Sequence, residues 1–491
     1  MVQIQISESI LEFEEVDQAK NVVATYIKSS FDEKGERVDI VTPKNANSYA
    51  RTVLNAFLPA GYPNSVTDDY LDLTYEKDSL QAFSSSIAGM LSSRAVLEGL
   101  SMYPRHRSCY SCQAGIGVGN SSASPTAALL LTVLQESMGR IATILFAHRL
   151  GTSLEPECKM YRLAADIFND AAMILDCLSP AFPKTSRVVL LSLSSVLRAL
   201  CGVAAGSSKA SLSAHFATQG NLGELNAKDS SQETVISLLG MLVGSIVVSH
   251  ISSKATTWIA LTLLLAVHLG TNYLAVRAVC MRTLNRQRAN LAFSHILQQL
   301  SDAEQRAKDK SPTPSSGPIN FPDALVYPTP EEIKLKERVF ERDGVLRWNG
   351  GQVLGYCKLG VSLQTLLKCF SKSNQTTGST VSAADHLTEL CEIFSGSEFL
   401  VWFDEPRKTF LVVLKDGSVA RAQLSAWMFA LSFARRGKSK KQSVMDALKE
   451  TLAYMNCVQP EIFRRLEEHA WDLERPALET KSGVRIRVRK D

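Results

Sequence analysis

Several charged side chains lie inside long apolar stretches, where a charge that faces lipid costs about 2.5 to 3.5 kcal/mol and is therefore usually functional. Arg162, Asp166 and Asp170 follow one another at intervals of four residues, so a helix places them on one face, where Arg162 can pair with Asp166. Such a face either binds a small polar molecule or holds helices together through polar contacts. The other charged or strongly polar candidates inside these apolar stretches are Arg140, Asn169, Arg198, Asn272 and Arg277.

Two polar blocks outside these stretches combine turn residues with groups that can bind a ligand. In LNAFLPAGYPNSVTDDYLDL, prolines and a glycine fix a turn beside aromatic and acidic side chains, and the candidates are Pro59, Gly61, Tyr62, Pro63, Asp69 and Tyr70. The block HFATQGNLGELNAKDSSQETV joins two apolar stretches, and its candidates are His215, Asn221, Lys228, Asp229 and Gln232. This second block predicts either a ligand-binding loop or an N-cap, made by Asp229 or Ser230, for a helix that begins near Glu233.

The short motifs that mark the common enzyme classes do not occur in this sequence. It contains no GxGxxG after a predicted strand and no GxxxxGK[ST], GxSxG or HExxH. No motif therefore indicates a dinucleotide-binding enzyme, a P-loop NTPase, an α/β-hydrolase or a zinc protease. Cys109 and Cys112 form a CxxC near His106, but a structural zinc site needs four ligands and no second pair lies at a suitable spacing. The sequence therefore predicts a non-enzymatic protein with no catalytic residues, no metal and no cofactor.

Composition divides the 491 residues into an apolar block and a charged one. Residues 114–280 carry 20 Asp, Glu, Lys and Arg side chains, whereas residues 281–491 carry 57. The formal net charge is only +4 with both signs interspersed, so we expect no nucleic acid as a partner. A hydrophobic content of 45% excludes a wholly disordered chain, and the ten scattered cysteines suit reduced, buried thiols better than a disulfide framework.

Helical stretches of small and apolar residues dominate the apolar block. We expect helices over 79–102, 125–149, 159–178, 187–206, 232–251 and 255–282. About 20 apolar residues span a bilayer, and the stretch 234–251 has no charge while 255–276 is interrupted only by His268 and Asn272. Small residues that favour tight helix packing are Gly202, Ala205, Gly206, Gly240 and Gly244. The pattern predicts a mainly α, polytopic membrane-type bundle of about six helices, and the alternative is a soluble bundle whose helices are nearly all buried.

The flanking segments are predicted from changes of pattern. Residues 1–44 are interpreted as an exposed acidic leader with one short strand at 38–41, and this start lacks the basic flank and apolar run of a secretory signal. Residues 296–330 are rich in Pro and Ser and are typical of a linker. Residues 331–491 predict a small α+β domain with strands at 351–361, 399–403, 410–414 and 484–488 and helices at 424–434 and 443–455. By the positive-inside rule, this domain is expected in the cytosol or an equivalent compartment, because the most apolar helix is followed by Arg277, Arg282, Arg286 and Arg288.

Seven blocks in this sequence, taken in order, resemble the root UVB sensitive family. They lie within residues 45–295 and read FLPAGYPNSVTDDYL, FSSSIAGMLSSRAVLEG, GVGNSSASPTAALLL, ESMGRIATILFAHRLGT, YRLAADIFNDAAMILDCLSP, NLGELNAKDSSQETV and LGTNYLAVRAV. The resemblance implies a membrane-associated helical protein linked, in plants, to ultraviolet-B tolerance of roots, early seedling development, auxin transport and vitamin B6 homeostasis. It also implies other family members or a second copy as partners. Residues 101–114 interrupt a region that is nearly continuous in the family, as an insertion or a retained intron would.

The order of the helices is also similar to one half of a major facilitator transporter, with an arginine inside the fourth helix and a Gly-rich fifth helix. In that arrangement a second copy completes the cavity, and the inward-facing groups are Arg140, Arg162, Asp166, Asn169, Asp170 and Arg198. We therefore expect a non-enzymatic, multi-pass protein of the lipid bilayer that contributes to vitamin B6-related small-molecule homeostasis by transport or scaffolding. The alternative is a soluble helical module that binds a vitamin B6 compound or a partner protein through the two polar blocks.

Overall fold

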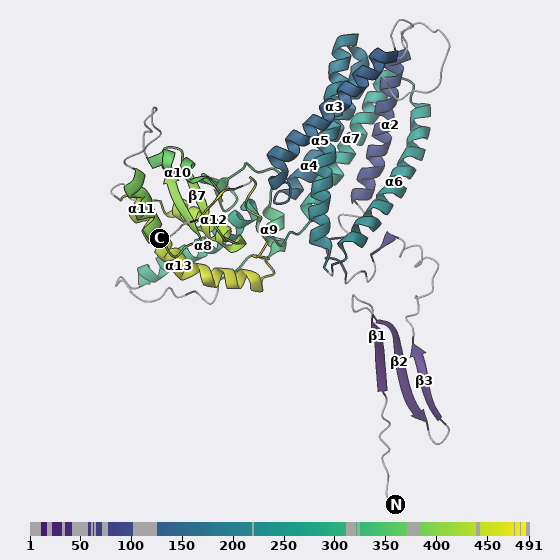
Figure 1. The fold of residues 1–491 in the computed structure, drawn as a ribbon. Helices are drawn as coiled ribbons and strands as arrows, with labels where there is room; N and C mark the ends of the chain where they lie inside the picture. Colours follow the sequence, from purple (N-terminus) through teal and green to yellow (C-terminus); the bar gives the residue numbers. More distant parts are fainter. Residues whose placement is uncertain are drawn as a thin grey trace, which may run out of the picture. The chain divides into compact units, whose positions relative to one another are not determined.

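The structure is a computed structural model of the 491-residue chain (Figure 1). It describes residues 11–16, 22–31, 35–41, 57–59, 62, 65–70, 77–101, 125–218, 220–310, 321, 325–370, 383–437, 442–475, 477–481 and 483–487. These residues form two compact units. The first comprises residues 1–135, 169–195 and 209–275, and the second comprises residues 136–168, 196–208 and 276–491.

The N-terminal segment forms an antiparallel sheet of three strands in the order β1-β2-β3. The strands are β1 Leu11–Val16, β2 Val22–Phe31 and β3 Gly35–Val41. The short strand predicted at 38–41 is present as the second half of β3, but β1 and β2, in a segment that was interpreted as an exposed leader, were missed. The β2 sequence VVATYIKSSF is rich in β-branched and aromatic residues, and these favour a pleated strand more strongly than the acidic residues around it oppose one.

Six long helices occupy the apolar block, at the positions that the sequence predicts. They are α2 Ser79–Ser101, α3 Pro125–Leu150, α4 Cys158–Leu178, α5 Lys184–Phe216, α6 Leu222–His250 and α7 Lys254–Ala278. By length and hydropathy, three of them, α5, α6 and α7, are candidates to cross a membrane among the described residues. Helices α2, α3 and α4 do not meet that criterion, so the predicted bundle of about six helices contains three candidate spans: α6 and α7, which cover the two best stretches in the sequence, and α5.

The connection between α5 and α6 is shorter than the sequence predicts. Helix α5 continues to Phe216 and α6 starts at Leu222, so most of the second polar block is helical. The N-cap of α6 is Asn221, and the prediction of Asp229 or Ser230 as the cap was wrong. The block contains Ala, Leu, Glu and Lys, which are strong helix formers, and no proline, so its polarity does not interrupt the helix.

Helices α2 and α6 lie side by side in the first unit (Figure 1). A Cβ atom on Gly240 would lie 2.9 Å from the carbonyl oxygen of Phe83, and one on Gly244 would lie 2.9 Å from the sulfur of Met90. These two glycines therefore allow the close approach that their spacing predicts. The expectation was wrong for Gly202 and Gly206, because no atom lies within 4 Å of where their Cβ atoms would be.

The C-terminal part of the second unit forms an α+β domain. Its elements are α8 Arg286–Lys310, α9 Pro330–Lys336, β4 Val345–Trp348, β5 Gln352–Lys358, α10 Leu363–Phe370, α11 Ala383–Ile393, β6 Phe399–Asp404, β7 Thr409–Lys415, α12 Ala420–Arg436, α13 Val444–Glu468 and β8 Arg485–Ile486. The sheet has the order β4-β5-β7-β6, with β8 paired to β7. Helix α12 is buried along most of its length and contacts α8, α13 and the sheet, and its Trp427 and Phe429 lie in the core.

The predictions for this domain hold best for its central elements. The expected hairpin is present as β6 and β7, which pair from Phe399 opposite Leu414 to Asp404 opposite Thr409. Helix α8 was missed, and it continues to Lys310 through the first half of the segment that was predicted as a linker. Its N-terminal half carries most of its large apolar residues and its C-terminal half most of its charges, so no single composition runs along the whole helix. The eight cysteines among the described residues are free, and three are buried, namely Cys158, Cys177 and Cys357.

Candidate functional site

The two predicted polar blocks contact each other in the first unit. The amide nitrogen of Tyr62 donates to the carbonyl oxygen of Pro59 at 3.2 Å, which closes a turn, while Gly61 and Pro63 lie outside the described residues. The segment that follows lies against the end of α5, because the amide of Thr67 donates to the carbonyl of Phe216 at 3.2 Å. The sequence singled out both blocks, and only the structure shows that they form one polar cluster.

Tyr70 connects the turn segment to both helices. Its hydroxyl donates to the Asp229 carboxylate on α6 at 2.8 Å, and its fully buried ring packs edge-on against Phe216 of α5, with 5.6 Å between the ring centroids. A phenol that donates to a carboxylate forms a charge-assisted hydrogen bond, which is stronger than one between neutral groups. Tyr70 therefore fixes the turn segment against the α5–α6 connection.

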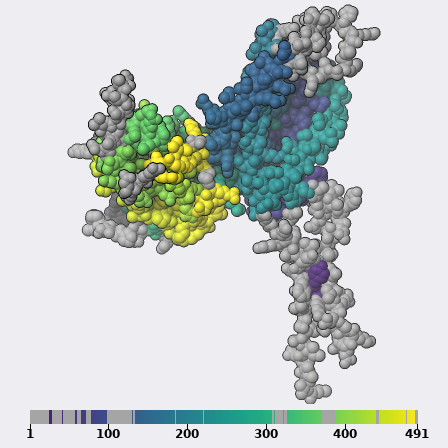
Figure 2. Space-filling view, viewed as in Figure 1, coloured from purple at the N-terminus to yellow at the C-terminus, as the bar shows by residue number. Residues whose placement is uncertain are grey.

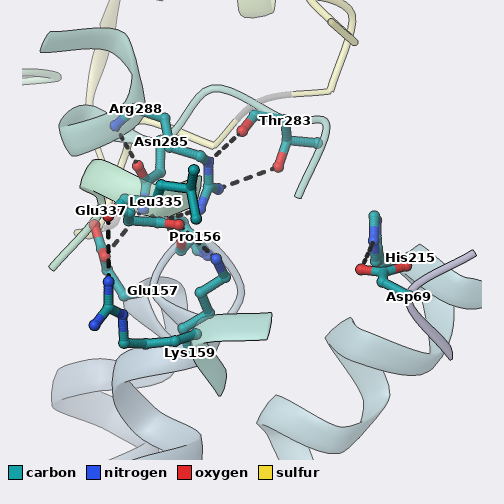
Figure 3. Close-up of polar contacts among 11 residues, drawn as sticks. Asp69, Pro156, Glu157, Lys159, His215, Thr283, Asn285, Arg288, Leu335 and Glu337 are labelled. Atoms are coloured by element: carbon teal, nitrogen blue, oxygen red, sulfur yellow. Dashed lines mark hydrogen bonds and ion pairs between the residues drawn. The ribbon is translucent and has the colours of Figure 1, made fainter. Parts of the chain in front are cut away.

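Asp69 and His215 form a second bridge between the blocks (Figure 3). The His215 Nε2 atom lies 3.3 Å from Asp69 Oδ2, and the hydroxyl of Thr67 donates to Asp69 Oδ1 at 2.6 Å. Both the imidazole and the carboxylate are about nine-tenths buried. The carboxylate is thus held on one side by an imidazole and on the other by a hydroxyl, an arrangement that orients the ring and can exchange a proton with it.

Two amides complete this cluster. The side chain of Asn221 donates to the carbonyl oxygen of Ser65 at 3.1 Å, and that of Gln232 donates to the carbonyl oxygen of Phe57 at 2.7 Å. Lys228 lies half-buried on α6 between these two positions. Most of the predicted polar residues therefore serve to attach the turn segment to the two helices.

A buried ionisable pair connects α4 and α7 within the first unit. His268 Nδ1 lies 2.8 Å from Asp170 Oδ1, and less than a twentieth of either side chain is exposed. Asn272, one turn further along α7, is fully buried, and Asn169 donates to the hydroxyl of Ser85 on α2 at 3.4 Å. Asp170 and Asn169 thus contact neighbouring helices, and the buried Asn272 and His268, which the sequence analysis noted as polar interruptions of an apolar stretch, lie near Asp170.

The remaining charged candidates have different surroundings. Asp166 is buried and Arg162 is half-buried on α4, so their expected pairing stays a prediction. Arg140 and Arg198 are exposed in the single chain, and the Arg140 side chain is 81% accessible beside Glu136 at 3.7 Å. Because the expected cavity is completed by a second copy, the inward orientation of these two arginines stays a prediction. Arg140 is long enough to extend from the helix into its surroundings and pair locally one turn away.

The structure also contains a buried ion cluster in the second unit that the sequence analysis missed (Figure 3). Glu337, which follows α9, receives hydrogen bonds from Lys159 Nζ at 2.5 Å and from Arg288 Nη1 at 2.6 Å. Arg288 Nε also donates to the carbonyl oxygen of Thr283 at 2.6 Å. Less than a tenth of each of the three charged side chains is exposed. The cluster ties the start of α4 to α8 and α9 at one point.

Polar groups next to this cluster extend it. Asn285 donates to the carbonyl oxygen of Pro156 at 3.3 Å and to Glu157 Oε2 at 3.2 Å. Arg277 donates to the carbonyl oxygen of Leu335 at 3.2 Å. Arg286 Nε donates to the carbonyl oxygen of Leu478 at 2.8 Å. Arg277, Arg286 and Arg288 were predicted as markers of membrane orientation, and in the structure they also make these tertiary contacts.

A cavity of about 140 Å³ lies beside the cluster. Glu157 and Arg286 line it, and burial raises the pKa of Glu157 from 4.5 to about 7, although Arg288 and Arg286 act in the opposite direction. Within the described residues, no group of three or more His, Cys, Asp and Glu side chains is arranged to hold a metal ion. Cys109 and Cys112 lie outside the described residues.

Comparison with known proteins places the chain in a family. A family model described as a vitamin B6 photo-protection and homoeostasis domain matches residues 43–300, which is about half of the chain. The chain belongs to the root UVB sensitive family. The matched range contains both polar blocks and the helices α2 to α7, so the resemblance that the sequence motifs indicate is confirmed.

Relatives in the root UVB sensitive family match different lengths of the chain. It is 36% identical over 288 residues to RUS family member 1 of Dictyostelium discoideum, covering 58% of this chain and 51% of that protein. It is 36% identical over 253 residues to root UVB sensitive 3 of Arabidopsis thaliana, covering 51% and 53%. A match to root UVB sensitive 5 of the same plant, at 23% identity over 442 residues, covers 87% and 75%. The chain thus spans about half the length of the first two relatives, and no solved structure matches it.

Proposed function

We propose that this root UVB sensitive protein is a membrane-embedded, non-enzymatic protein that contributes to vitamin B6 homeostasis by moving a small molecule across a bilayer. The proposal is supported most by the apolar surface of α5, α6 and α7. In the most apolar 18-residue window of α6, only 11% of the residues are buried, and the corresponding shares are 17% for α5 and 33% for α7. These helices are therefore apolar mainly where they face outward.

The cost of this surface in water supports lipid as its solvent. The large side chains Leu238, Leu242 and Ile246 of α6 are each more than half exposed, and so are Ile259 and Leu263 of α7. At about 25 cal/mol per Å² of apolar area, each half-exposed Leu or Ile forgoes roughly 1 kcal/mol of burial. Contiguous exposed surface of this kind marks a membrane or a protein interface. Figure 2 draws the part of the chain that contains α5, α6 and α7 in space-filling form, in shades of teal.

The buried pair of Asp170 and His268 supports transport rather than a purely structural role. A carboxylate and an imidazole are expensive to place among apolar helices, and such groups line the paths of protons and polar substrates in many membrane proteins. His268 lies within α7, one of the candidate spanning helices, and Asn272 extends the polar groups by one turn. In a scaffold the same pair would serve only as a polar contact between α4 and α7, and the uptake experiment below separates the two roles.

Alkaline carbonate extraction tests the membrane part of the proposal. An integral protein stays in the membrane pellet at high pH, whereas a peripheral or soluble one is released. We expect the full chain to remain in the pellet. Release into the supernatant, together with a monodisperse state in buffer without detergent, would reject the proposal in favour of a soluble module that uses the polar cluster around Tyr70.

Reconstitution in vesicles tests the transport part. We expect vesicles that contain the full chain to take up labelled pyridoxine faster than empty vesicles do. The variant Asp170→Asn, which has nearly the same shape, should lose most of this uptake, while Asp302→Asn on the exposed face of α8 should not. If folded protein gives no uptake above empty vesicles, scaffolding is the function that survives.

A further inference from the structure

The cavity next to the buried ion cluster has the size of a small ring compound. It lies in the second unit between the end of α3, the start of α4, the start of α8 and the loop that leads into β4, and its volume is about 140 Å³. An engineered protein cavity of about 150 Å³ accommodates one benzene molecule. The available space therefore suits a single six-membered ring and leaves none for a fused ring system.

The wall of the cavity combines apolar and polar groups. Leu150, Met160 and Val345 supply apolar contacts. The hydroxyls of Tyr161 and Ser153 lie 2.7 Å apart and form a polar edge. A ring that carries hydroxyl groups fits such a wall better than a plain hydrocarbon does, because buried hydroxyls need hydrogen-bond partners.

The side-chain amide of Gln287 is a further hydrogen-bonding group in the cavity wall. It is 8% exposed and lines the cavity, and its side-chain amide makes no hydrogen bond with the described residues. The amide is open to the cavity, so water bonds to it when the cavity is empty and a ligand can replace that water. Its NH₂ group can donate to a ring nitrogen and its oxygen can accept from a ring hydroxyl.

Glu157 adds a group that can both donate and accept near neutral pH. One of its oxygens accepts from Asn285, and its burial keeps the carboxyl partly protonated at pH 7, with a pKa of about 7. The charged groups that act on it are Arg288, Arg286, Glu337 and Glu341. A carboxyl in this state pairs well with a pyridine nitrogen, because either partner can hold the proton.

The mouth of the cavity carries an excess of positive charge. Arg149, Arg342 and Lys481 are exposed side chains that line it. The acids beside them are already engaged: Glu341 accepts two hydrogen bonds from Arg347, and Asp343 pairs with Arg286 and, at 3.8 Å, with Lys481. Arg342 donates to the Tyr356 hydroxyl at 2.9 Å. Arg149 makes no ion pair within the described part of the chain. Such a mouth suits a phosphate group attached to the ring.

We propose that this cavity binds a single-ring nitrogen heterocycle that carries hydroxyl groups and a phosphate ester, which is the chemical class of the phosphorylated vitamin B6 compounds. The inference deepens the proposed function, on which it rests for the choice of vitamin B6. The ring occupies the cavity between Met160 and Val345, the Gln287 amide and the Glu157 carboxyl bond to its polar edge, and Arg149 binds the phosphate at the mouth.

Equilibrium dialysis of the purified full chain in detergent tests the proposal. The probes are labelled pyridoxine and pyridoxine 5′-phosphate, which have no aldehyde and so do not react with lysines. We expect saturable binding of both at one site per chain. Gln287→Leu, which keeps the volume of the side chain, should weaken both at least tenfold, and Gln305→Leu, the same change at an exposed position of the same helix, should leave both within twofold.

A second pair of variants separates the ring from the phosphate and covers the case in which Gln287→Leu does not fold. Tyr161→Phe removes a hydroxyl from the wall and should weaken both compounds several-fold. Arg149→Gln should weaken only the phosphorylated one. Equal binding by Gln287→Leu and Gln305→Leu, no binding of either compound by folded wild-type protein, or binding of inorganic phosphate with no preference for the ring would each overturn the proposal.

The outcomes also distinguish this proposal from the proposed function. A chain that stays in the carbonate pellet and supports uptake but shows no binding that depends on Gln287 leaves the membrane function standing and rejects the cavity as the ligand site. A chain that is released by carbonate but binds pyridoxine 5′-phosphate through Gln287 rejects membrane transport and supports the cavity.

Discussion

Replacing Glu337 with glutamine should destabilise the second unit by about 3 to 5 kcal/mol, the usual cost of removing one member of a buried ion pair. The Glu337 carboxylate lies 2.5 Å from Lys159 Nζ and 2.6 Å from Arg288 Nη1, and more than nine-tenths of each side chain is buried. Glutamine has nearly the same shape but no charge, so the variant leaves two buried cations without their counter-charge.

The chain offers a matched control at its surface. Glu461 also bridges two arginines, Arg464 and Arg465, but all three side chains are more than a quarter exposed. Glu461→Gln should therefore cost less than about 1 kcal/mol. The assay is denaturant unfolding in detergent followed by tryptophan fluorescence, which reports mainly on this unit because it contains four of the five tryptophans, namely Trp348, Trp402, Trp427 and Trp471.

The contribution of Glu337 to the free energy of unfolding should depend on pH in one direction only. Burial alone raises the pKa of Glu337, but the charges of Arg288 and Lys159 outweigh it and hold the pKa below 4.5. The stabilisation is therefore fully present above pH 4.5 and is lost as the pH falls through the lower pKa of the folded state. If Glu337→Gln costs no more than Glu461→Gln at pH 7, the idea that this cluster compensates buried charge is wrong.

Three further perturbations test other contacts, each by unfolding in detergent. Because burial raises the pKa of Glu157 to about 7, the free energy of unfolding of the wild type should fall as the pH rises from 4.5 to 7. The variant Glu157→Gln should remove this pH dependence and stabilise the protein at pH 8 by roughly 1 to 3 kcal/mol. An unchanged pH dependence in the variant contradicts this assignment. Gly240→Leu should cost about 1 to 3 kcal/mol, because α2 leaves no room for a side chain, while Gly202→Leu should be neutral; equal effects would mean that α2 and α6 are not in close contact. Tyr70→Phe removes a hydrogen bond to the Asp229 carboxylate and should cost about 1.5 to 3 kcal/mol, and a neutral result would show that the turn segment is held by apolar packing alone.

Local pattern in the sequence located most of the secondary structure. Runs of apolar and small residues marked the six helices to within a few residues, except where α5 and α6 continue into the polar block that connects them. Two short apolar runs on either side of a polar turn that contains Pro406 marked the hairpin of β6 and β7. The N-terminal sheet was missed because its strands are mixed in character, and α8 was missed because its two halves differ in composition. A periodic signal needs a uniform face, and these elements lack one.

The sequence pattern also singled out the residues of the polar cluster, but it did not predict the contacts between them. Asp69, Tyr70, His215 and Asp229 were all singled out, and the structure joins them across as many as 159 residues of chain. The sequence pattern also did not predict which arginine side chains are exposed. Arg140 and Arg198 look like buried charges in the sequence because their neighbours are apolar, yet both side chains extend outward.

By itself, the sequence determined the family, the apolar helices and the central hairpin. Motifs and runs of apolar residues are local features of the chain, and they can be recognised without knowing which residues contact one another in the fold. The tertiary structure decided which charges are buried together. Lys159 and Glu337 are 178 residues apart, and no spacing rule connects them. The same holds for Glu157 and Gln287, whose surroundings come from four separate parts of the chain. The pKa of a carboxyl and the partners of an amide depend on what the fold packs around them, and only the folded chain fixes that.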